Sequence, residues 1–394
     1  MSTPSSMDVW VLAGQSNMQG CGLLRDATLC DASPSDPRVW SFSTAGHWEI
    51  AQEPLHRLWE SFTPVHQTFM RGNFGEEEQK LSDQEIAARE ASTRTTGAGL
   101  GISFALAMAD STNNTIGLIP AAHGGTSLED WNFNRKDQGG ASLYGAMLER
   151  VRKAKESASF NLKGVLWYQG ESDCFEVAAE SYGERMSDWI EQMRADLNDA
   201  TLPFIAVQIG RVLVAPGDAN SGWQAQHWET VREALRVLPE SMPHSAVVSA
   251  IDLGLCDTIH IDTPGLIRLG KRMALLAQNL KAAPSLKKIE VGGSHPLGYG
   301  TARVLCENVN GGWNPKTRIT GFEVSDAEGK LHAKTTAIAA NADARNPKTI
   351  NLILSTPLDE SVRIGYGLGL DPCCNAVDDN DMPLPAFTAQ AISA

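Results

Sequence analysis

The sequence predicts an α/β fold, a five-stranded parallel sheet sandwiched by helices, followed by a small antiparallel β domain. Over the first two-thirds of the 394 residues, short apolar runs alternate with segments of helical periodicity. This alternation is typical of a parallel sheet covered on both faces. From about Leu286 the helical periodicity stops, and short β-type runs separated by turn residues follow. We therefore expect two domains, residues 1–285 and 286–394.

Five runs rich in Val, Ile and Leu are the predicted parallel strands, because they are too short for helices and apolar throughout. They are Asp8–Ala13, Thr115–Pro120, Leu162–Tyr168, Pro203–Ile209 and Ala246–Asp252. Apolar residues at helical spacing predict helices over 182–197 and 266–280. The predicted strands of the second domain are Ala302–Val309, Arg318–Val324, Thr349–Leu354 and Val362–Tyr366, and a polar loop at Asp378–Asp381 precedes an extended terminus.

The segment from about 21 to 95 is irregular and carries Trp40, Trp48 and Trp59. We expect these aromatic side chains mostly to pack beneath surface loops, since large rings bury well. The alternative is that the segment forms a cap over a functional site.

Composition narrows the class of protein. The chain has 33 basic and 47 acidic side chains, a formal net charge of −14, which argues against nucleic acid or an anionic membrane as the main partner. The sequence contains no run of 18 apolar residues, so we expect no transmembrane helix. Residues 1–7 lack the features of a signal peptide. We expect a cytoplasmic protein or a trimmed secreted or periplasmic one. The oligomeric state is left open.

The seven cysteines include no CxxC pair, so neither a disulfide framework nor a structural zinc site is expected. One bridge from Cys306 to Cys373 or Cys374 is an alternative to free thiols. We expect no metal and no organic cofactor.

Four polar clusters follow predicted strands. In the first, Gly14–Met18, a serine at a strand-to-helix turn can present its hydroxyl at the sheet edge, with a helix N-terminus behind it to stabilise negative charge. Ser16 can alternatively cap that helix. In the second, His123–Ser127, the paired glycines let backbone N–H groups approach a ligand, unless they form only a tight turn.

The third cluster, Trp167–Asp173, offers the side-chain amide of Gln169 as a donor, and its acidic residues are either functional or helix N-terminal charges. In the fourth, Asp257 and His260 are three residues apart on a loop. A histidine can serve as general base for a serine, and a carboxylate can fix its tautomer. Because all four clusters lie at carboxyl ends of parallel strands, we expect them to assemble one site for acyl transfer.

These clusters carry a family resemblance. The blocks GQSNM (14–18), GGTSLEDW (124–131), WYQGESD (167–173) and DTIH (257–260) resemble those of the SGNH (GDSL-like) hydrolases, which have a flavodoxin-like fold. More narrowly, they are similar to the sialate O-acetylesterase domain and to carbohydrate esterase family six, which includes acetylxylan esterases. The stretch Val39–His56 is also similar, and the resemblance covers roughly residues 8 to 282.

The resemblance implies a role for each matching residue. Ser16 matches the nucleophile, His260 the base and Asp257 its carboxylate. The matching oxyanion donors are the Ser16 N–H, a glycine N–H and the Gln169 amide, with the two candidate glycines being Gly124 and Gly125. The wider SGNH pattern has asparagine where this chain has Gln169, whereas the narrower group carries glutamine. Candidate substrate contacts are Gln15, Asn17, His123, Trp131 and Glu171.

The function we expect is a carboxylic ester hydrolase that removes acetyl groups from an acetylated sugar or glycan, without a cofactor. The alternative is a non-catalytic carbohydrate-binding protein on the same scaffold. That alternative predicts a missing member of the triad, whereas Ser16, Asp257 and His260 are all present.

Overall fold

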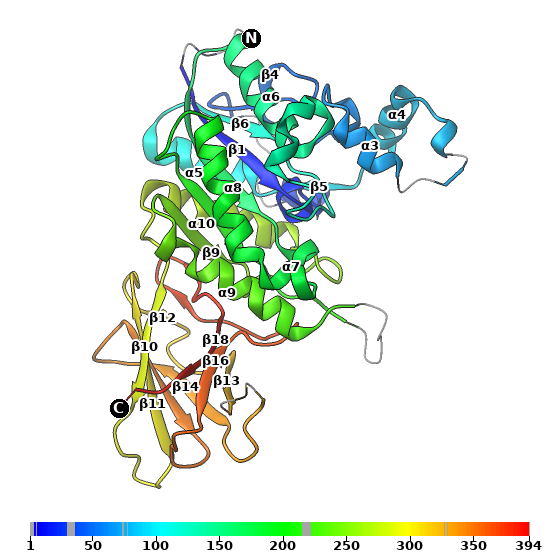
Figure 1. The fold of residues 1–394 in the computed structure, drawn as a ribbon. Coiled ribbons are helices and arrows are strands. Elements are labelled where there is room, and N and C mark those ends of the chain that lie inside the picture. Colours follow the sequence, from blue (N-terminus) through cyan, green and yellow to red (C-terminus); the bar gives the residue numbers. More distant parts are fainter. Residues whose placement is uncertain are drawn as a thin grey trace. The chain divides into compact units, whose positions relative to one another are not determined.

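A central seven-stranded sheet organises the structure, a computed structural model that describes residues 4, 6–29, 36–72, 75–76, 78–214, 222–326, 328 and 330–393. Its strand order is β4-β3-β6-β1-β7-β8-β9. Figure 1 labels β1, β4, β6 and β9 of this sheet. The bounds are β1 Asp8–Gly14, β3 Val39–Phe42, β4 Trp48–Ile50, β6 Ile116–Pro120, β7 Asn161–Tyr168, β8 Phe204–Gln208 and β9 Ser245–Ser249. β1 pairs in parallel with both β6 and β7, which confirms the predicted α/β class.

Helices connect these strands. The longer ones are α4 Asp83–Thr93, α5 Gly101–Thr112, α6 Leu143–Ser157, α8 Tyr182–Asp196, α9 Ala225–Ser241 and α10 Thr263–Gln278. Shorter ones are α1 Ser16–Gln19, α2 Leu24–Leu29, α3 Val65–Arg71 and α7 Glu176–Glu180, with 3-10 turns at Leu58–Glu60, Glu78–Lys80, Phe133–Ala141 and Glu171–Asp173. The predicted helices near 182–197 and 266–280 correspond to α8 and α10. Among the described residues, no helix has the length and apolar character needed to cross a bilayer.

The segment 21–95 contributes more to the sheet than its irregular sequence suggests. β3 pairs in parallel with β6, and β4 pairs antiparallel with β3, so two strands extend the predicted five. The short β2 Gly22–Leu23 pairs with β5 Thr96–Ala98. Trp40, Trp48 and Trp59 are at most 9% exposed, which confirms their packing role.

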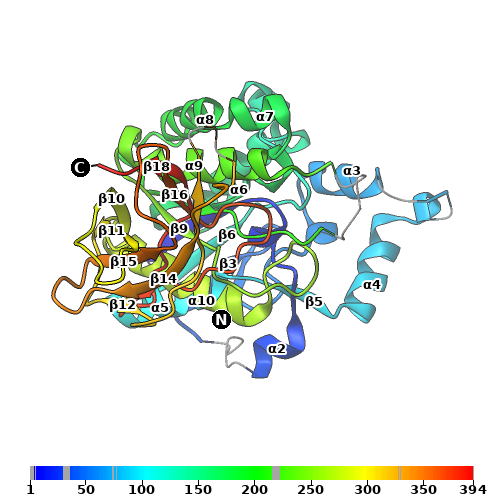
Figure 2. The same cartoon turned by 90° about the horizontal axis from the view of Figure 1, so that it is seen from below.

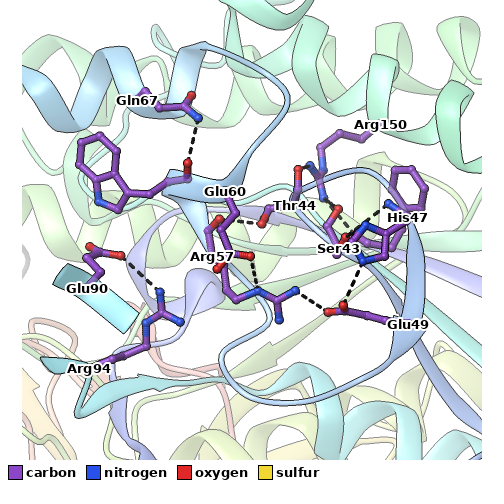
Figure 3. Close-up of polar contacts among 12 residues, drawn as sticks. Ser43, Thr44, His47, Glu49, Arg57, Glu60, Gln67, Glu90, Arg94 and Arg150 are labelled. Atoms are coloured by element: carbon purple, nitrogen blue, oxygen red, sulfur yellow. Dashed lines mark hydrogen bonds and ion pairs between the residues drawn. The ribbon is translucent and has the colours of Figure 1, made fainter. Parts of the chain in front are cut away.

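Ion pairs and carbonyl contacts hold this segment together (Figure 3). Arg57 lies between two carboxylates, with 2.5 Å to Glu49 and 2.8 Å to Glu60. Arg150 of α6 is fully buried and donates to the carbonyls of Phe42, Ser43 and Thr44. Figures 1 and 2, viewed from directions 90° apart, both show α3 and α4 together at one flank.

Buried histidines pack α3 onto the second polar cluster. Nδ1 of His66 lies 3.0 Å from Nδ1 of His123, and the two rings stack. Burial lowers the pKa of His123 to about 4 and the pKa of His66 well below its ordinary value. His56, which is 6% exposed, has its pKa lowered to about 3 for the same reason. These rings are therefore neutral in the folded protein near pH 7.

The chain divides into two compact units. One comprises the residues up to Asp173 with Glu184–Ile205 and Gly254–Ala277, and the other comprises Cys174–Gly183, Ala206–Leu253 and the residues from Gln278. The second unit holds small antiparallel sheets in the order β10-β11-β15-β14, β13-β16-β18 and β12-β17. Their bounds are β10 Ser285–Val291, β11 Gly300–Glu307, β12 Trp313–Asn314, β13 Phe322–Ser325, β14 Ala337–Ala342, β15 Thr349–Leu354, β16 Arg363–Tyr366, β17 Val377–Asp378 and β18 Phe387–Ala391.

Two buried side chains of the second unit bond to the C-terminal segment. Gln208, at the end of β8, both donates to and accepts from the backbone of Ala386, with each distance 2.8 Å. The guanidinium of Arg232 on α9 is 1% exposed and donates to the carbonyls of Gly367 and Gly369. Residues on both sides of the predicted boundary at 285 therefore share buried polar contacts. The domain division itself stays a prediction.

The described cysteines are free thiols, so the disulfide bridge that the sequence allowed is not formed. Cys306, Cys373 and Cys374 are all unbridged, as are the other cysteines that the structure describes. Cys30 lies outside the described residues.

Truncation after residue 285 should destabilise what remains, because the buried Arg232 and Gln208 would lose their carbonyl partners. We expect a truncated chain that is insoluble or melts well below the full chain in a thermal unfolding assay. The milder variant Gln208→Leu should lose about 1–3 kcal/mol of unfolding free energy. A truncated chain that melts with the full chain would contradict this role of the C-terminal segment.

Acid should destabilise the protein through its buried histidines. A folded-state pKa near 4 for His123, against an ordinary 6.5, gives stability that is present above about pH 6.5 and lost as the pH falls toward 4. Replacing His66 with Asn should reduce the slope of unfolding free energy against pH by up to about 1.4 kcal/mol per pH unit. Urea unfolding at several pH values measures this. The matched control His47→Asn, whose side chain is 63% exposed, should keep the wild-type slope.

Candidate active site

The first cluster places Ser16 at a sharp turn after β1. Gly14 has φ +128°, and a Cβ there would lie 2.2 Å from the carbonyl oxygen of Tyr168, so only glycine fits. Gln15 is the N-cap of α1 and Ser16 is its first residue, so Ser16 does not cap the helix. Because α1 has only four residues, its dipole adds little. Stabilisation of a developing charge here depends on individual N–H groups.

The second cluster abuts Ser16. A Cβ added to Gly124 would lie 3.3 Å from Cβ of Ser16, and Gly125 has φ +70° with open space beside it. The Gly124 N–H donates to Oε1 of Gln19, at 2.8 Å. Within the described ranges, the backbone N–H groups of Ser16 and Gly125 have no hydrogen-bond partner. Two of the predicted oxyanion donors are therefore available and one glycine is engaged.

Gln169 is engaged as well. Its Nε2 donates to the carbonyl of Thr126 at 3.1 Å and to Oδ2 of Asp173 at 2.6 Å, and the residue is fully buried. These contacts use both protons of the amide. The structure therefore does not support the predicted role of Gln169 as an oxyanion donor. The side chain instead joins the second cluster to the third.

Asn17 joins three clusters. Its Nδ2 donates to Oε1 of Glu171 at 2.9 Å and to the carbonyl of Ile259 at 3.4 Å, while its Oδ1 accepts from the N–H of Ile261 at 2.9 Å. Ile259 and Ile261 flank His260, so Asn17 holds the His260 loop next to the nucleophile helix. Asn17 is 1% exposed, and its bonds explain its burial better than the predicted substrate contact does.

The fourth cluster forms a carboxylate–imidazole pair. Nδ1 of His260 lies 2.6 Å from Oδ2 of Asp257, and Oδ1 of Asp257 accepts from the N–H groups of Ile259 and His260. Burial opposes ionisation of Asp257, but the hydrogen bonds from His260 and the two N–H groups outweigh it, so its pKa is lowered. Asp257 therefore stays ionised, and it orients the imidazole through Nδ1.

Gln15 and Glu171 are buried beside Ser16, each 3% exposed. Oε1 of Gln15 accepts from the N–H groups of Gly170 and Ser172, at 3.4 and 3.3 Å. Oε2 of Glu171 is buried without a hydrogen-bond partner, and burial raises the pKa of this carboxyl.

Two further predicted substrate contacts belong to the core. Trp131 is 0% exposed, packs against Trp167 and Trp189, and donates its Nε1–H to Thr126. It has no face available for a sugar, which corrects that prediction. His123 is 5% exposed and packs against His66. The sequence motifs around Trp131 and His123 indicated that both residues lie near the site. They did not indicate that both side chains are buried.

Sequence reasoning missed two supports of the site. Gln19 lies one helical turn after Ser16, a spacing that places both on one face of α1 and that was the available signal. Arg185 of α8 donates to Oδ1 of the fully buried Asp173, whose Oδ2 also accepts from the N–H of Leu128. No local pattern linked Arg185 to the third cluster. In the part of the chain that is described, no three His, Cys, Asp or Glu side chains are grouped to hold a metal ion.

Several known proteins are similar to this chain. A probable carbohydrate esterase from Arabidopsis thaliana is 29% identical over 281 residues, which cover 68% of this chain and 88% of that protein. A crystal structure of an Arabidopsis thaliana protein matches with TM-score 0.51 and 28% identity over 71% of this chain and 100% of that one. A carbohydrate acetylesterase from Xanthomonas citri shares the fold, with TM-score 0.66 and 21% identity over 96% of this chain and 80% of that one.

The model of the SASA family, described as carbohydrate esterases and sialic acid-specific acetylesterases, matches residues 6–279, which include all four clusters. The chain belongs to this family of carbohydrate esterases.

Proposed function

We propose that the protein is a serine hydrolase that removes acetyl groups from an acetylated carbohydrate. The observation that carries the proposal is the 2.6 Å contact between Asp257 and His260, on a loop that Asn17 tethers beside Ser16. Membership of a carbohydrate esterase family and the resemblance to a carbohydrate acetylesterase of Xanthomonas citri support the substrate class.

In the proposed reaction, the Ser16 hydroxyl attacks the acetyl carbonyl while Nε2 of His260 takes its proton. Asp257 holds Nδ1–H and stabilises the imidazolium that forms. The backbone N–H groups of Ser16 and Gly125 donate to the oxyanion, since both are without partners among the described residues. His260 then protonates the leaving sugar hydroxyl.

Deacylation repeats the same chemistry with water. His260 takes a proton from water, which attacks the acetyl group on Ser16. The bond from Oγ of Ser16 to the acetyl carbon then breaks, His260 returns the proton to Oγ, and acetate leaves. In this scheme Gln19 keeps the turn at Gly124 in place, so that the next N–H, that of Gly125, is presented beside Ser16. Gln169 acts behind the turn through Thr126 rather than on the substrate.

Replacing Ser16 with Ala should lower the hydrolysis of 4-nitrophenyl acetate by about 10⁴-fold or more, because the nucleophile is removed. Ser16 is only partly buried and the change removes a single oxygen atom, so the melting temperature should stay close to wild type. Initial rates and thermal unfolding check both points. A variant that keeps its activity would refute the nucleophile assignment.

The substitution Asp257→Asn should lower kcat by about 10³- to 10⁴-fold, because an amide facing Nδ1 favours the wrong imidazole tautomer. Asp262→Asn is the matched control: it lies on the same loop, and Oδ1 of Asp262 caps α10 by accepting from the N–H of Gly265. Steady-state kinetics of both variants measure the difference. Equal activity of the two variants would show that the carboxylate of Asp257 has no special role.

A further inference from the structure

Two polar atoms beside Ser16 have no hydrogen-bond partner among the described residues. One is Oε2 of Glu171, an acceptor when the carboxyl is ionised. The other is Nε2 of Gln15, a donor, because the contacts of Gln15 all involve its Oε1 or its backbone. Each residue is 97% buried, since 3% of its surface is exposed. Of the two atoms, only Oε2 of Glu171 is among the buried atoms without a partner in the described residues. A buried polar atom is rarely left unpaired, so Oε2 of Glu171 indicates a ligand, and Nε2 of Gln15 is a donor available beside it.

The two atoms belong to one tethered unit. Gln15 and Asn17 flank the nucleophile, and both reach the same turn of the chain. Gln15 accepts from the N–H groups of Gly170 and Ser172, on either side of Glu171. Asn17 donates to Oε1 of Glu171, so that Oε2 is the carboxyl oxygen without a partner among the described residues. The geometry thus holds one acceptor and one donor next to Ser16.

A hydroxyl group matches this pair. It donates one hydrogen bond and accepts others, so a single hydroxyl can donate to Glu171 and accept from Gln15. An aliphatic or aryl ester offers no such group beside its carbonyl. In a partly acetylated sugar, the carbon next to the acetylated one usually carries a free hydroxyl.

We propose that Gln15 and Glu171 form a subsite for the free hydroxyl on the carbon adjacent to the acetyl ester. This inference rests on the proposed esterase function and narrows its substrate to sugars that are acetylated beside an unmodified hydroxyl. The subsite selects the monoacetylated sugar unit because an acetyl group or a hydrogen in place of that hydroxyl cannot donate to Oε2. Binding there aligns the ester carbonyl with Ser16.

The test compares two substrates: methyl 2-O-acetyl-β-D-xyloside, which has a free 3-hydroxyl, and its 3-deoxy analogue. The wild type should show a kcat/KM ratio of about 10- to 100-fold in favour of the hydroxylated ester, because the hydrogen bond involves a carboxylate. A 3-deoxy-3-fluoro ester, which cannot donate, should behave like the deoxy analogue. Acetate release measures all three.

Glu171→Gln should bring the ratio close to one. Asn17 keeps the amide oxygen of the new side chain at the Oε1 position, so its NH₂ group occupies the Oε2 position and cannot accept from the hydroxyl. Gln15→Glu keeps the acceptor for Gly170 and Ser172, loses the donor, and should also lower the ratio. Glu176→Gln, which removes the same charge from an exposed position, should keep the wild-type ratio.

A wild-type ratio near one overturns the subsite, and so does a Glu171→Gln variant that keeps the wild-type ratio. If Glu171→Gln does not fold, the three substrates on the wild-type enzyme still decide. A wild-type protein that hydrolyses neither ester nor 4-nitrophenyl acetate overturns the esterase function itself, and this result is distinct from a loss of selectivity.

Discussion

The side-chain amide of Asn17 is the interaction on which the candidate site depends. It is buried, and it bonds at once to Glu171, to the carbonyl of Ile259 and to the N–H of Ile261. These partners lie more than 150 residues away along the chain. Without this amide, the His260 loop would lose its bonds to the nucleophile helix and keep its internal contacts, such as those of Asp257 and the N–H of Cys256 to the carbonyl of His260. The chemistry therefore relies on a residue that need not touch the substrate.

A second set of contacts connects the turns on the other side of Ser16. Oε1 of Gln19 accepts from the N–H of Gly124. Nε2 of Gln169 donates to the carbonyl of Thr126 and to the carboxylate of Asp173. Each amide bonds to the backbone of the second cluster, so the turns are fixed before any ligand arrives. Such preorganisation lets N–H groups stabilise a developing charge without rearranging. Because most polar groups of these turns already have hydrogen-bond partners, the few atoms without a partner indicate where a ligand binds.

Sequence reasoning located the fold and the clusters well. The apolar runs and the alternation with helices predicted β1, β6, β7, β8 and β9, because buried parallel strands must be apolar on both faces. It missed β3 and β4, since four- and three-residue strands within an irregular segment leave too short a pattern. In the C-terminal part it missed β10 and β14, whose alternation is interrupted by exposed lysines or by alanines.

The sequence by itself determined which residue types stand at the carboxyl ends of the strands, and so which chemistry is available: a serine, a histidine and a carboxylate. Only the tertiary structure decided which side chains support the site and which remain open to a ligand. It buried Trp131 in the core, engaged both amide protons of Gln169, and left Glu171 with an unpaired oxygen. The physical reason is that hydrogen-bond satisfaction depends on partners distant in sequence, which no local pattern encodes.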